Sequence, residues 1–195
     1  MRYADIARYF GGAGVRDLSS SNLISDDTQM TLFTAEGLLN AQRQGKSLVK
    51  SVYRSYLRWY YTQTNSKMPG AKYEGGLLNE PKLFAARAPG NTCLSSISSG
   101  KMGTLSDPIN HSRGCGGVMR IAPCAAFPNA FELGCRIAAI THGHPGGYIS
   151  AGALADLLQK LYYGQSLPDA VNDLIEELDE IENAESTRDA LQHAV

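Results

Sequence analysis

The feature that most limits the fold is the spacing of apolar residues, which repeat every three or four positions along most of the chain. Residues 49–60 show it most clearly, with Lys50, Arg54 and Arg58 placed between the apolar positions. Such spacing puts the apolar side chains on one face of a helix. No segment shows the alternation typical of a half-buried strand. Because 43% of the 195 residues are apolar, the sequence predicts an all-α protein with a single compact multi-helix domain.

Further helices are predicted from the same spacing and from residues that favour helix ends. Ser47 precedes the helix at 49–60, and Asn129 with Glu132 has the spacing of a reciprocal N-terminal cap. Thr92 would cap a short helix in the irregular region 65–110, and the N-terminus of that helix would suit an anion. The other predicted helices cover residues 1–10, 27–45, 77–84, 92–98, 129–140, 149–163, 168–178 and 186–195.

Charge and composition argue against several classes of function. The net charge of −1 argues against electrostatic binding of nucleic acid and against a basic patch for membranes. No apolar run approaches the roughly 18 residues of a membrane span and no signal peptide is visible, so a cytoplasmic location is expected. No two cysteines form a C-x-x-C pair, so we expect buried thiols rather than disulfides or a zinc site. The four cysteines are Cys93, Cys115, Cys124 and Cys135.

Two adjacent carboxylates are the strongest candidate for a binding site. Asp26 and Asp27 follow Ser25 directly and open the predicted helix at 27–45. Neighbouring carboxylates repel each other, so a fold that buries them must supply a cation, a proton or strong donors. Hard divalent cations such as Mg²⁺ and Mn²⁺ prefer oxygen ligands of this kind. The alternative interpretation is an ordinary Asp cap followed by a solvated Asp in the first turn.

A glycine-rich loop and a histidine phrase follow later in the chain. Gly114, Gly116 and Gly117 lie within four positions and would let backbone N–H groups approach a ligand closely. The loop matches neither the P-loop nor the dinucleotide fingerprint, and a tight turn is the alternative. His142 and His144 have no third ligand with zinc-like spacing, so we favour a substrate contact over a metal site. A hydrogen-bonded structural histidine is the alternative there.

In this order, residues 25–30, 114–120 and 141–145 resemble the ADP-ribosylglycohydrolase family, which includes the dinitrogenase reductase-activating glycohydrolase type. Residues 89–93 are also similar to its bacterial members. The resemblance implies an all-α fold around two Mg²⁺ or Mn²⁺ ions that hold ADP-ribose. It also implies cleavage of the N- or O-glycosidic bond between ADP-ribose and a modified side chain. Divalent cations suit this chemistry because they bind ribose hydroxyls and activate water.

The resemblance implies roles for individual residues as well. Ser25, Asp26 and Asp27 would supply one half of the metal ligands. The backbone of the glycine-rich loop would approach the ribose and phosphates, and Met119 and Arg120 would hold that loop in place. The residues that the resemblance assigns to substrate binding are Gly114, Cys115, Gly116, Gly117, Met119, Arg120 and His142.

The chain departs from the family pattern at both ends. The family typically begins with an apolar helix that carries a Gly-Asp-Ala-Leu-Gly phrase near a catalytic acidic residue. It typically ends with a second metal-binding phrase of the Asp-x-Asp-Thr type. Residues 1–195 contain neither phrase, so the single domain at 1–195 is expected to be incomplete at both ends. On this view the catalytic residue lies outside the sequence, and the site holds two ions, one or none.

Three functions are therefore left open by the sequence. The first is a metal-dependent hydrolase that removes ADP-ribose. The second is a catalytically inactive module that binds ADP-ribose or blocks a partner, and the third is a purely structural helical domain. The expected partner is an ADP-ribosylated protein or ADP-ribose itself, with no nucleic acid and no membrane. Self-association is expected through surfaces that the missing helices would cover.

Overall fold

The computed structural model describes residues 3–12, 14, 16 and 23–194. These residues form helices and no strand, which confirms the predicted all-α class. The α-helices are α1 (Tyr3–Phe10), α2 (Asp26–Gln44), α3 (Leu48–Thr64), α4 (Asn91–Ser98), α5 (Ala130–Ala139), α6 (Pro145–Tyr162), α7 (Leu167–Asp179) and α8 (Glu185–Ala194). Short 3₁₀ helices are η1 (Gly76–Asn79), η2 (Pro81–Leu83), η3 (Val118–Arg120) and η4 (Ala122–Ala126).

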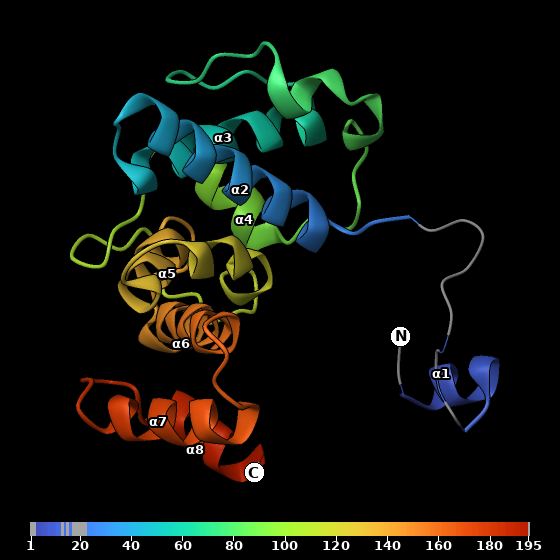
Figure 1. Cartoon of the computed structure of the whole chain (residues 1–195). Coiled ribbons are helices and arrows are strands. Elements are labelled where there is room, and N and C mark those ends of the chain that lie inside the picture. Colours follow the sequence, from blue (N-terminus) through green and yellow to red (C-terminus); the bar gives the residue numbers. More distant parts are fainter. Residues whose placement is uncertain (1–2, 13, 15, 17–22, 195) are drawn as a thin grey trace.

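The helices are stacked along the long direction of the molecule (Figure 1). α2 and α3 lie together at one end, α5 and α6 lie in the middle, and α7 and α8 form the other end. α1 lies to one side of this stack. None of the helices in the described residues combines the length and apolar character that crossing a membrane requires.

Two glycines let neighbouring helices approach closely around the main core. A Cβ atom added to Gly37 of α2 would lie 2.6 Å from Val52 Cα of α3. A Cβ atom added to Gly134 of α5 would lie 3.0 Å from Gly152 Cα of α6. Larger residues at either position would push the helices apart, because interiors are packed to the density of organic crystals. The close α2–α3 and α5–α6 pairs form the framework on which the candidate site is built.

The irregular region 65–110 is held in part by a buried amide of α2. Gln29 is fully buried, and its Nε2 donates to the carbonyl oxygens of Leu83 (3.3 Å) and Ala85 (3.1 Å). Its Oε1 accepts a hydrogen bond from the indole N–H of Trp59 at 3.3 Å. Trp59 is buried although it lies off the predicted apolar stripe of α3, and it belongs to the same core cluster as Leu83.

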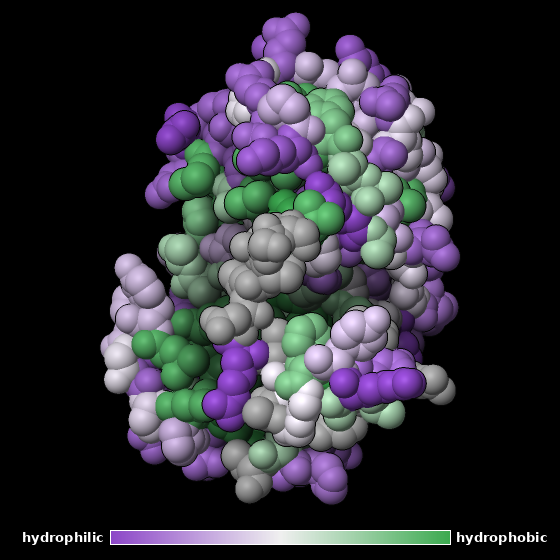
Figure 2. Space-filling view, turned by 90° about the vertical axis from the view of Figure 1, so that its right-hand side faces the viewer, coloured by the Kyte–Doolittle hydropathy of each residue, from purple (hydrophilic) through white to green (hydrophobic). Residues whose placement is uncertain are grey.

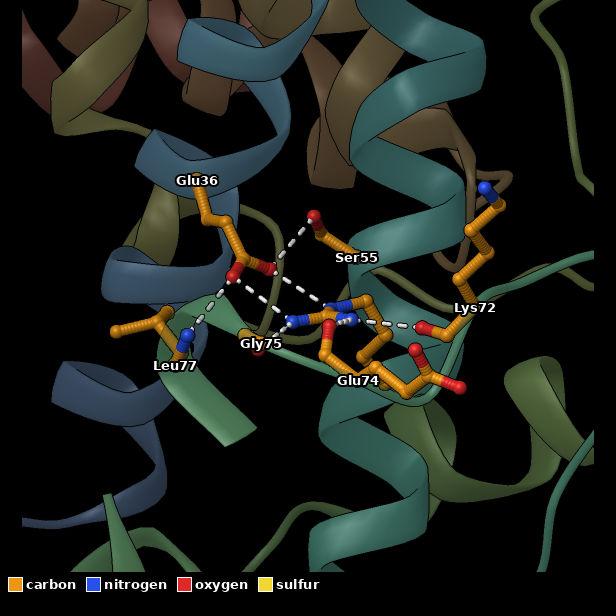
Figure 3. A network of polar contacts seen from close by, with 7 residues as sticks. Glu36, Ser55, Lys72, Glu74, Gly75 and Leu77 are labelled. Carbon is orange, nitrogen blue, oxygen red and sulfur yellow. Dashed lines mark hydrogen bonds and ion pairs between the residues drawn. The ribbon is translucent and has the colours of Figure 1, made fainter. Parts of the chain in front are cut away.

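A second polar network fixes residues 72–77 to the α2–α3 pair (Figure 3). The Arg58 guanidinium makes two contacts of 3.0 Å with the Glu36 carboxylate. It also donates to the carbonyl oxygens of Lys72 (2.6 Å), Glu74 (3.1 Å) and Gly75 (2.7 Å). Because these carbonyls belong to one irregular segment, a single side chain satisfies backbone groups that no regular element would satisfy.

α7 and α8 cover the far side of α6, and a small apolar cluster shared mainly by α6 and α7 lies separate from the main core. Lys160 of α6 pairs with Glu177 of α7 at 2.8 Å and also with Asp156. Much of the acidic run of α7 is exposed, as the sequence predicts, but Glu177 has this specific partner. The cluster consists of Ile149, Ala153, Leu174, Leu178 and Ala184.

The surface mixes polar and apolar residues. Figure 2 shows hydrophilic residues along much of the outline of the upper part of the molecule and hydrophobic residues toward its middle. Large apolar side chains are exposed at several places in the described residues rather than in one helix. They are Tyr9, Phe10, Leu23, Leu32, Leu39, Phe84, Leu105, Tyr162, Tyr163 and Leu167.

The predicted reciprocal cap of α5 is wrong. Asn129 does occupy the position before the helix, but its backbone is left-handed (φ 56°) and its side chain makes no capping hydrogen bond. Glu132 instead forms an exposed ion pair with Arg136 at 3.2 Å. The left-handed conformation that Asn tolerates, rather than a side-chain cap, explains the residue at this position.

Two other helix starts differ from the sequence-based expectations. α4 begins at Asn91, so Thr92 lies inside the helix and does not cap it. α6 begins at Pro145 rather than at residue 149, because His144 acts as its N-cap. The His144 Nδ1 accepts the backbone N–H of Gly146 at 3.0 Å. Residues 145–148, which the sequence predicts to be part of a loop, therefore form the first turn of α6.

Candidate functional site

The aspartate pair forms the first turn of α2, and its two carboxylates have different surroundings. Asp26 is 7% exposed, and its Oδ2 accepts the backbone N–H of Gly90 at 3.2 Å. The backbone N–H of Asp26 donates to the Arg87 carbonyl at 3.0 Å. Asp27 is exposed, and its Oδ2 accepts the hydroxyl of Ser25 at 2.7 Å. One carboxylate is thus held against the start of α4 while the other faces solvent.

Burial raises the pKa of the Asp26 carboxyl, the Gly90 N–H lowers it, and the neighbouring charge of Asp27 raises it again. The fold therefore supplies each carboxylate of the pair with a donor, the Gly90 N–H for Asp26 and the Ser25 hydroxyl for Asp27. A nearby cation would favour the ionised form of Asp26.

The glycine-rich loop lies against His142 and α4. A Cβ atom added to Gly116 would lie 2.9 Å from His142 Nε2 and 3.0 Å from the Cys93 sulfur. A Cβ added to Gly114 would lie 3.7 Å from the same nitrogen, which is an ordinary contact. Glycine at 116 is therefore required by close packing against the histidine. The loop, the histidine and α4 meet at one place in the fold.

The cysteines near this place are of two kinds. Cys93 and two other thiols are buried and free, as predicted, but Cys115 in the loop is exposed, so the expectation of four buried thiols is wrong at that position. Burial raises the pKa of Cys124 and of Cys135 to about 12, which keeps both as inert thiols.

Thr31 connects the aspartate pair to the loop. Its hydroxyl lies 2.8 Å from the Asp27 carbonyl oxygen and 3.2 Å from the Met119 carbonyl oxygen. Met119 belongs to η3, which follows the glycines directly. The contact places the end of the loop beside α2, one helical turn after the aspartates. The structure therefore brings two phrases about 90 residues apart in the sequence into one region.

Arg120 is fully buried and contacts only the interior of the protein. Its Nη2 donates to the Thr141 hydroxyl oxygen at 2.7 Å, and its Nη1 lies 3.5 Å from the Cys93 sulfur. The guanidinium lies over the Tyr56 ring, 4.5 Å from its centroid. No carboxylate pairs with it in the described part of the chain, and its Nε has no partner there. A buried charge of this kind is costly, which favours a role beyond packing.

His142 follows the residue that Arg120 contacts and is 1% exposed. Its Nδ1 lies 2.8 Å from the Thr141 hydroxyl oxygen. Burial, and then the positive charge of Arg120, lower the pKa of His142 from 6.5 to about 4. The imidazole is therefore neutral near pH 7.

Several residues of this arrangement were not assigned a role from the sequence. Gly90 and Cys93 lie in a phrase quoted only for its resemblance, and Thr141 only precedes the histidine. Thr31 carries no signal, since a threonine in a helix is common. The phrase at residues 89–93 could have pointed to Gly90 and Cys93, and the adjacent Thr141 and His142 could have pointed to Thr141.

The donors around the aspartates fit a hard cation in chemical type. In the described residues no three His, Cys, Asp or Glu side chains gather as a metal site. The donors that do lie together are the carboxylates of Asp26 and Asp27 and the hydroxyl of Ser25, all of them oxygen. Mg²⁺ is commonly held by one or two carboxylates together with substrate phosphates and water. These three residues therefore fit a partial ligand set for Mg²⁺ or Mn²⁺.

A cavity of about 990 Å³ lies elsewhere, between α2, α3 and residues 70–77. None of the residues predicted for the site lines it. Glu36 and Arg58 in its wall are engaged with each other and with the backbone, so they serve the packing of this region (Figure 3). Size alone therefore does not make this cavity the functional site.

Comparison with known proteins gave a match to a family model. A family model described as ADP-ribosylglycohydrolase matches residues 1–195. Comparison with curated proteins and with solved structures gave no match. The matched residues include the aspartate pair, the glycine-rich loop and the histidine phrase. The chain therefore belongs to the ADP-ribosylglycohydrolase family.

Proposed function

We propose that this protein is a metal-dependent hydrolase that removes ADP-ribose from modified protein side chains by cleaving an N- or O-glycosidic bond. The family supports glycohydrolase activity in general. The observation that carries the proposal is the Thr31 hydroxyl, which lies beside carbonyl oxygens of both Asp27 and Met119. It joins a cluster of hard oxygen donors to a loop suited to a sugar phosphate.

Ser25, Asp26 and Asp27 would hold Mg²⁺ or Mn²⁺. When bound, such an ion supplies Lewis acidity to ribose hydroxyls and to a water molecule, which suits the oxocarbenium character of glycosidic cleavage. The carboxylate of Asp27 is the exposed one and would be accessible to a ligand from solvent. Asp26, anchored by the Gly90 N–H, would fix the position of the pair.

The other residues would bind and orient the ADP-ribose. The loop around Gly114 and Gly116 would place backbone N–H groups close to phosphate or ribose oxygens, and the absence of a Cβ at Gly116 lets this loop lie directly on His142. His142 would add a donor without adding charge, since its imidazole is neutral. The partner is accordingly an ADP-ribosylated protein.

The test is release of ADP-ribose from two labelled peptides, one ADP-ribosylated on Arg and the other on Ser. Release should require Mg²⁺ or Mn²⁺ and stop with EDTA. Asp27→Asn should slow it at least about a hundredfold, because even changes beside metal ligands commonly cost 10–100-fold. Asp107→Asn, an exposed loop carboxylate, is the matched control and should have full activity.

Release that persists in EDTA, or in Asp27→Asn, would contradict the proposed role of the aspartates. Binding of ADP-ribose with no release from either peptide would instead identify an inactive ADP-ribose-binding module.

A further inference from the structure

Arg120, Thr141 and His142 form a continuous polar chain under the glycine-rich loop. All three are buried, at 0%, 0% and 1% exposure. Arg120 Nη2 lies 2.7 Å from Thr141 Oγ1, and that oxygen lies 2.8 Å from His142 Nδ1. The far nitrogen of the imidazole, Nε2, faces Gly114 and Gly116. These polar contacts therefore connect the buried guanidinium of Arg120 to the side of the glycine-rich loop that faces the protein interior.

The Thr141–His142 contact can run in either direction, and the protons are assigned by combining donor counting with acceptor strength. A guanidinium has only donors, so Thr141 Oγ1 must accept from Arg120. The single hydroxyl proton of Thr141 is then free to be donated, and the positive charge behind it makes it a better donor. Two side chains could take it, the imidazole nitrogen of His142 and the sulfur of Cys93. Sulfur is a weak acceptor, so the Thr141 hydroxyl donates its proton to His142 Nδ1.

The remaining imidazole nitrogen is unused by the protein. With Nδ1 acting as an acceptor, the proton of a neutral imidazole lies on Nε2. No hydrogen bond from the described residues to Nε2 is seen, and Nε2 is not one of the fully enclosed polar atoms that lack a partner. This N–H faces Gly114 and Gly116 and is used by no protein acceptor among the described residues, so it is available to an acceptor on a ligand held by the loop.

We propose that Arg120 and Thr141 are positioning residues that fix His142 in the Nε2–H tautomer, so that this N–H donates to a phosphate or ribose oxygen of ADP-ribose held in the loop. The inference rests on the proposed function for the identity of the ligand, whereas the tautomer is a property of the protein alone. It also explains why the fold retains a guanidinium with no carboxylate partner: its charge orients a hydroxyl instead of forming an ion pair.

The test is long-range ¹H–¹⁵N correlation NMR of the ¹⁵N-histidine-labelled full chain, which shows which ring nitrogen carries the proton. The protein has four histidines, and a His142→Gln spectrum assigns the signal. The wild type should show His142 protonated on Nε2. Thr141→Val should shift it toward the Nδ1–H form, because the donor to Nδ1 is lost, and Thr141→Ser should restore the wild-type pattern.

Calorimetry with ADP-ribose gives the functional counterpart. Thr141→Val should weaken binding about tenfold, equivalent to about 1.4 kcal/mol. Thr141→Ser and the control Thr64→Val, which changes an exposed threonine at the end of α3, should bind as the wild type does.

An Nδ1–H signal in the wild type, or an unchanged tautomer in Thr141→Val, overturns the inference. If Thr141→Val does not fold, the wild-type spectrum alone still shows whether His142 carries its proton on Nε2 or on Nδ1. If the wild type has the Nε2–H tautomer but binds no ADP-ribose, the proposed function is wrong and the assignment of the tautomer still holds.

Discussion

Two arginines in the described part of the chain, Arg58 and Arg120, are buried, and they differ in whether a carboxylate neutralises them. This contrast separates the region that holds the fold from the region that holds the candidate site. Arg58 pairs with the Glu36 carboxylate and satisfies three backbone carbonyls of one loop (Figure 3). Arg120 has no carboxylate partner in the described residues. It contacts the Thr141 hydroxyl, two sulfur atoms, the Tyr56 ring and, at 3.4–3.5 Å, two backbone carbonyls of α5. Neutralised charges serve packing, whereas a charge left without a counter-ion points to a ligand site nearby.

The largest expected effect is on the Arg58 side of this comparison. Arg58→Met should lower the free energy of unfolding by about 3–5 kcal/mol, because it leaves the largely buried Glu36 carboxylate without its partner. Urea denaturation measures this. Arg136→Met breaks the exposed pair with Glu132 and should lose less than about 1 kcal/mol. Equal losses in the two variants would contradict a structural role for Arg58.

A slightly smaller effect concerns pH and His142. Its pKa is 6.5 unfolded and about 4 folded, so the unfolded chain binds more protons between these values. Stability is therefore fully present above about pH 6.5 and is lost as the pH falls toward 4, by about 3 kcal/mol for this group. Thermal or urea unfolding across this window should show the loss in the wild type and a shallower profile in His142→Gln. Parallel profiles would mean that the imidazole titrates normally.

The glycine-rich loop gives the next effect. Gly116→Ala should lower stability by about 1–3 kcal/mol, since its Cβ would lie 2.7 Å from His142 Cε1. Gly114→Ala is the matched control, because its nearest neighbour would be 3.5 Å away. If both variants unfold at the same urea concentration, the loop does not pack on the histidine as described.

The smallest change in stability is expected for Arg120→Met, within about 2 kcal/mol, because no carboxylate is left uncompensated when the charge is removed. ADP-ribose affinity should nevertheless fall about tenfold, which corresponds to about 1.4 kcal/mol. Arg58→Met should show the reverse pattern, with lower stability and unchanged affinity in the folded protein. Stability and affinity that fall together in both variants would remove the distinction between the two arginines.

The local pattern of the sequence predicts the helices well, because apolar spacing reports which face of a helix is buried. α2, α3, α5 and α8 lie close to their predicted ranges. The start of α6 was misplaced because Pro145 and two glycines look like a loop, and only the structure shows that His144 caps them.

Long-range polar partners could not be predicted in this way. Gln29 reaches Leu83, 54 residues away, and Arg120 reaches back 90 residues to Met30. Neither contact produces a repeating pattern in the sequence from which it could be predicted. For the site, the sequence named the aspartates, the loop and the histidine, and it missed the hydroxyls of Thr31 and Thr141 that connect them.

The most direct test is titration of ADP-ribose with Mg²⁺ into the ¹⁵N-labelled protein, followed through its backbone amide signals. We expect the amides of Asp27, Gly90, Gly114 and Gly116 to shift together and to saturate at one ligand concentration, while Gly37 and Gly76 beside the Glu36–Arg58 pair stay unchanged. Shifts confined to the region of Gly76 would contradict this account. Shifts of the glycine-rich loop without shifts of the aspartate turn would also contradict a single site formed by the aspartate turn, the start of α4 and the loop.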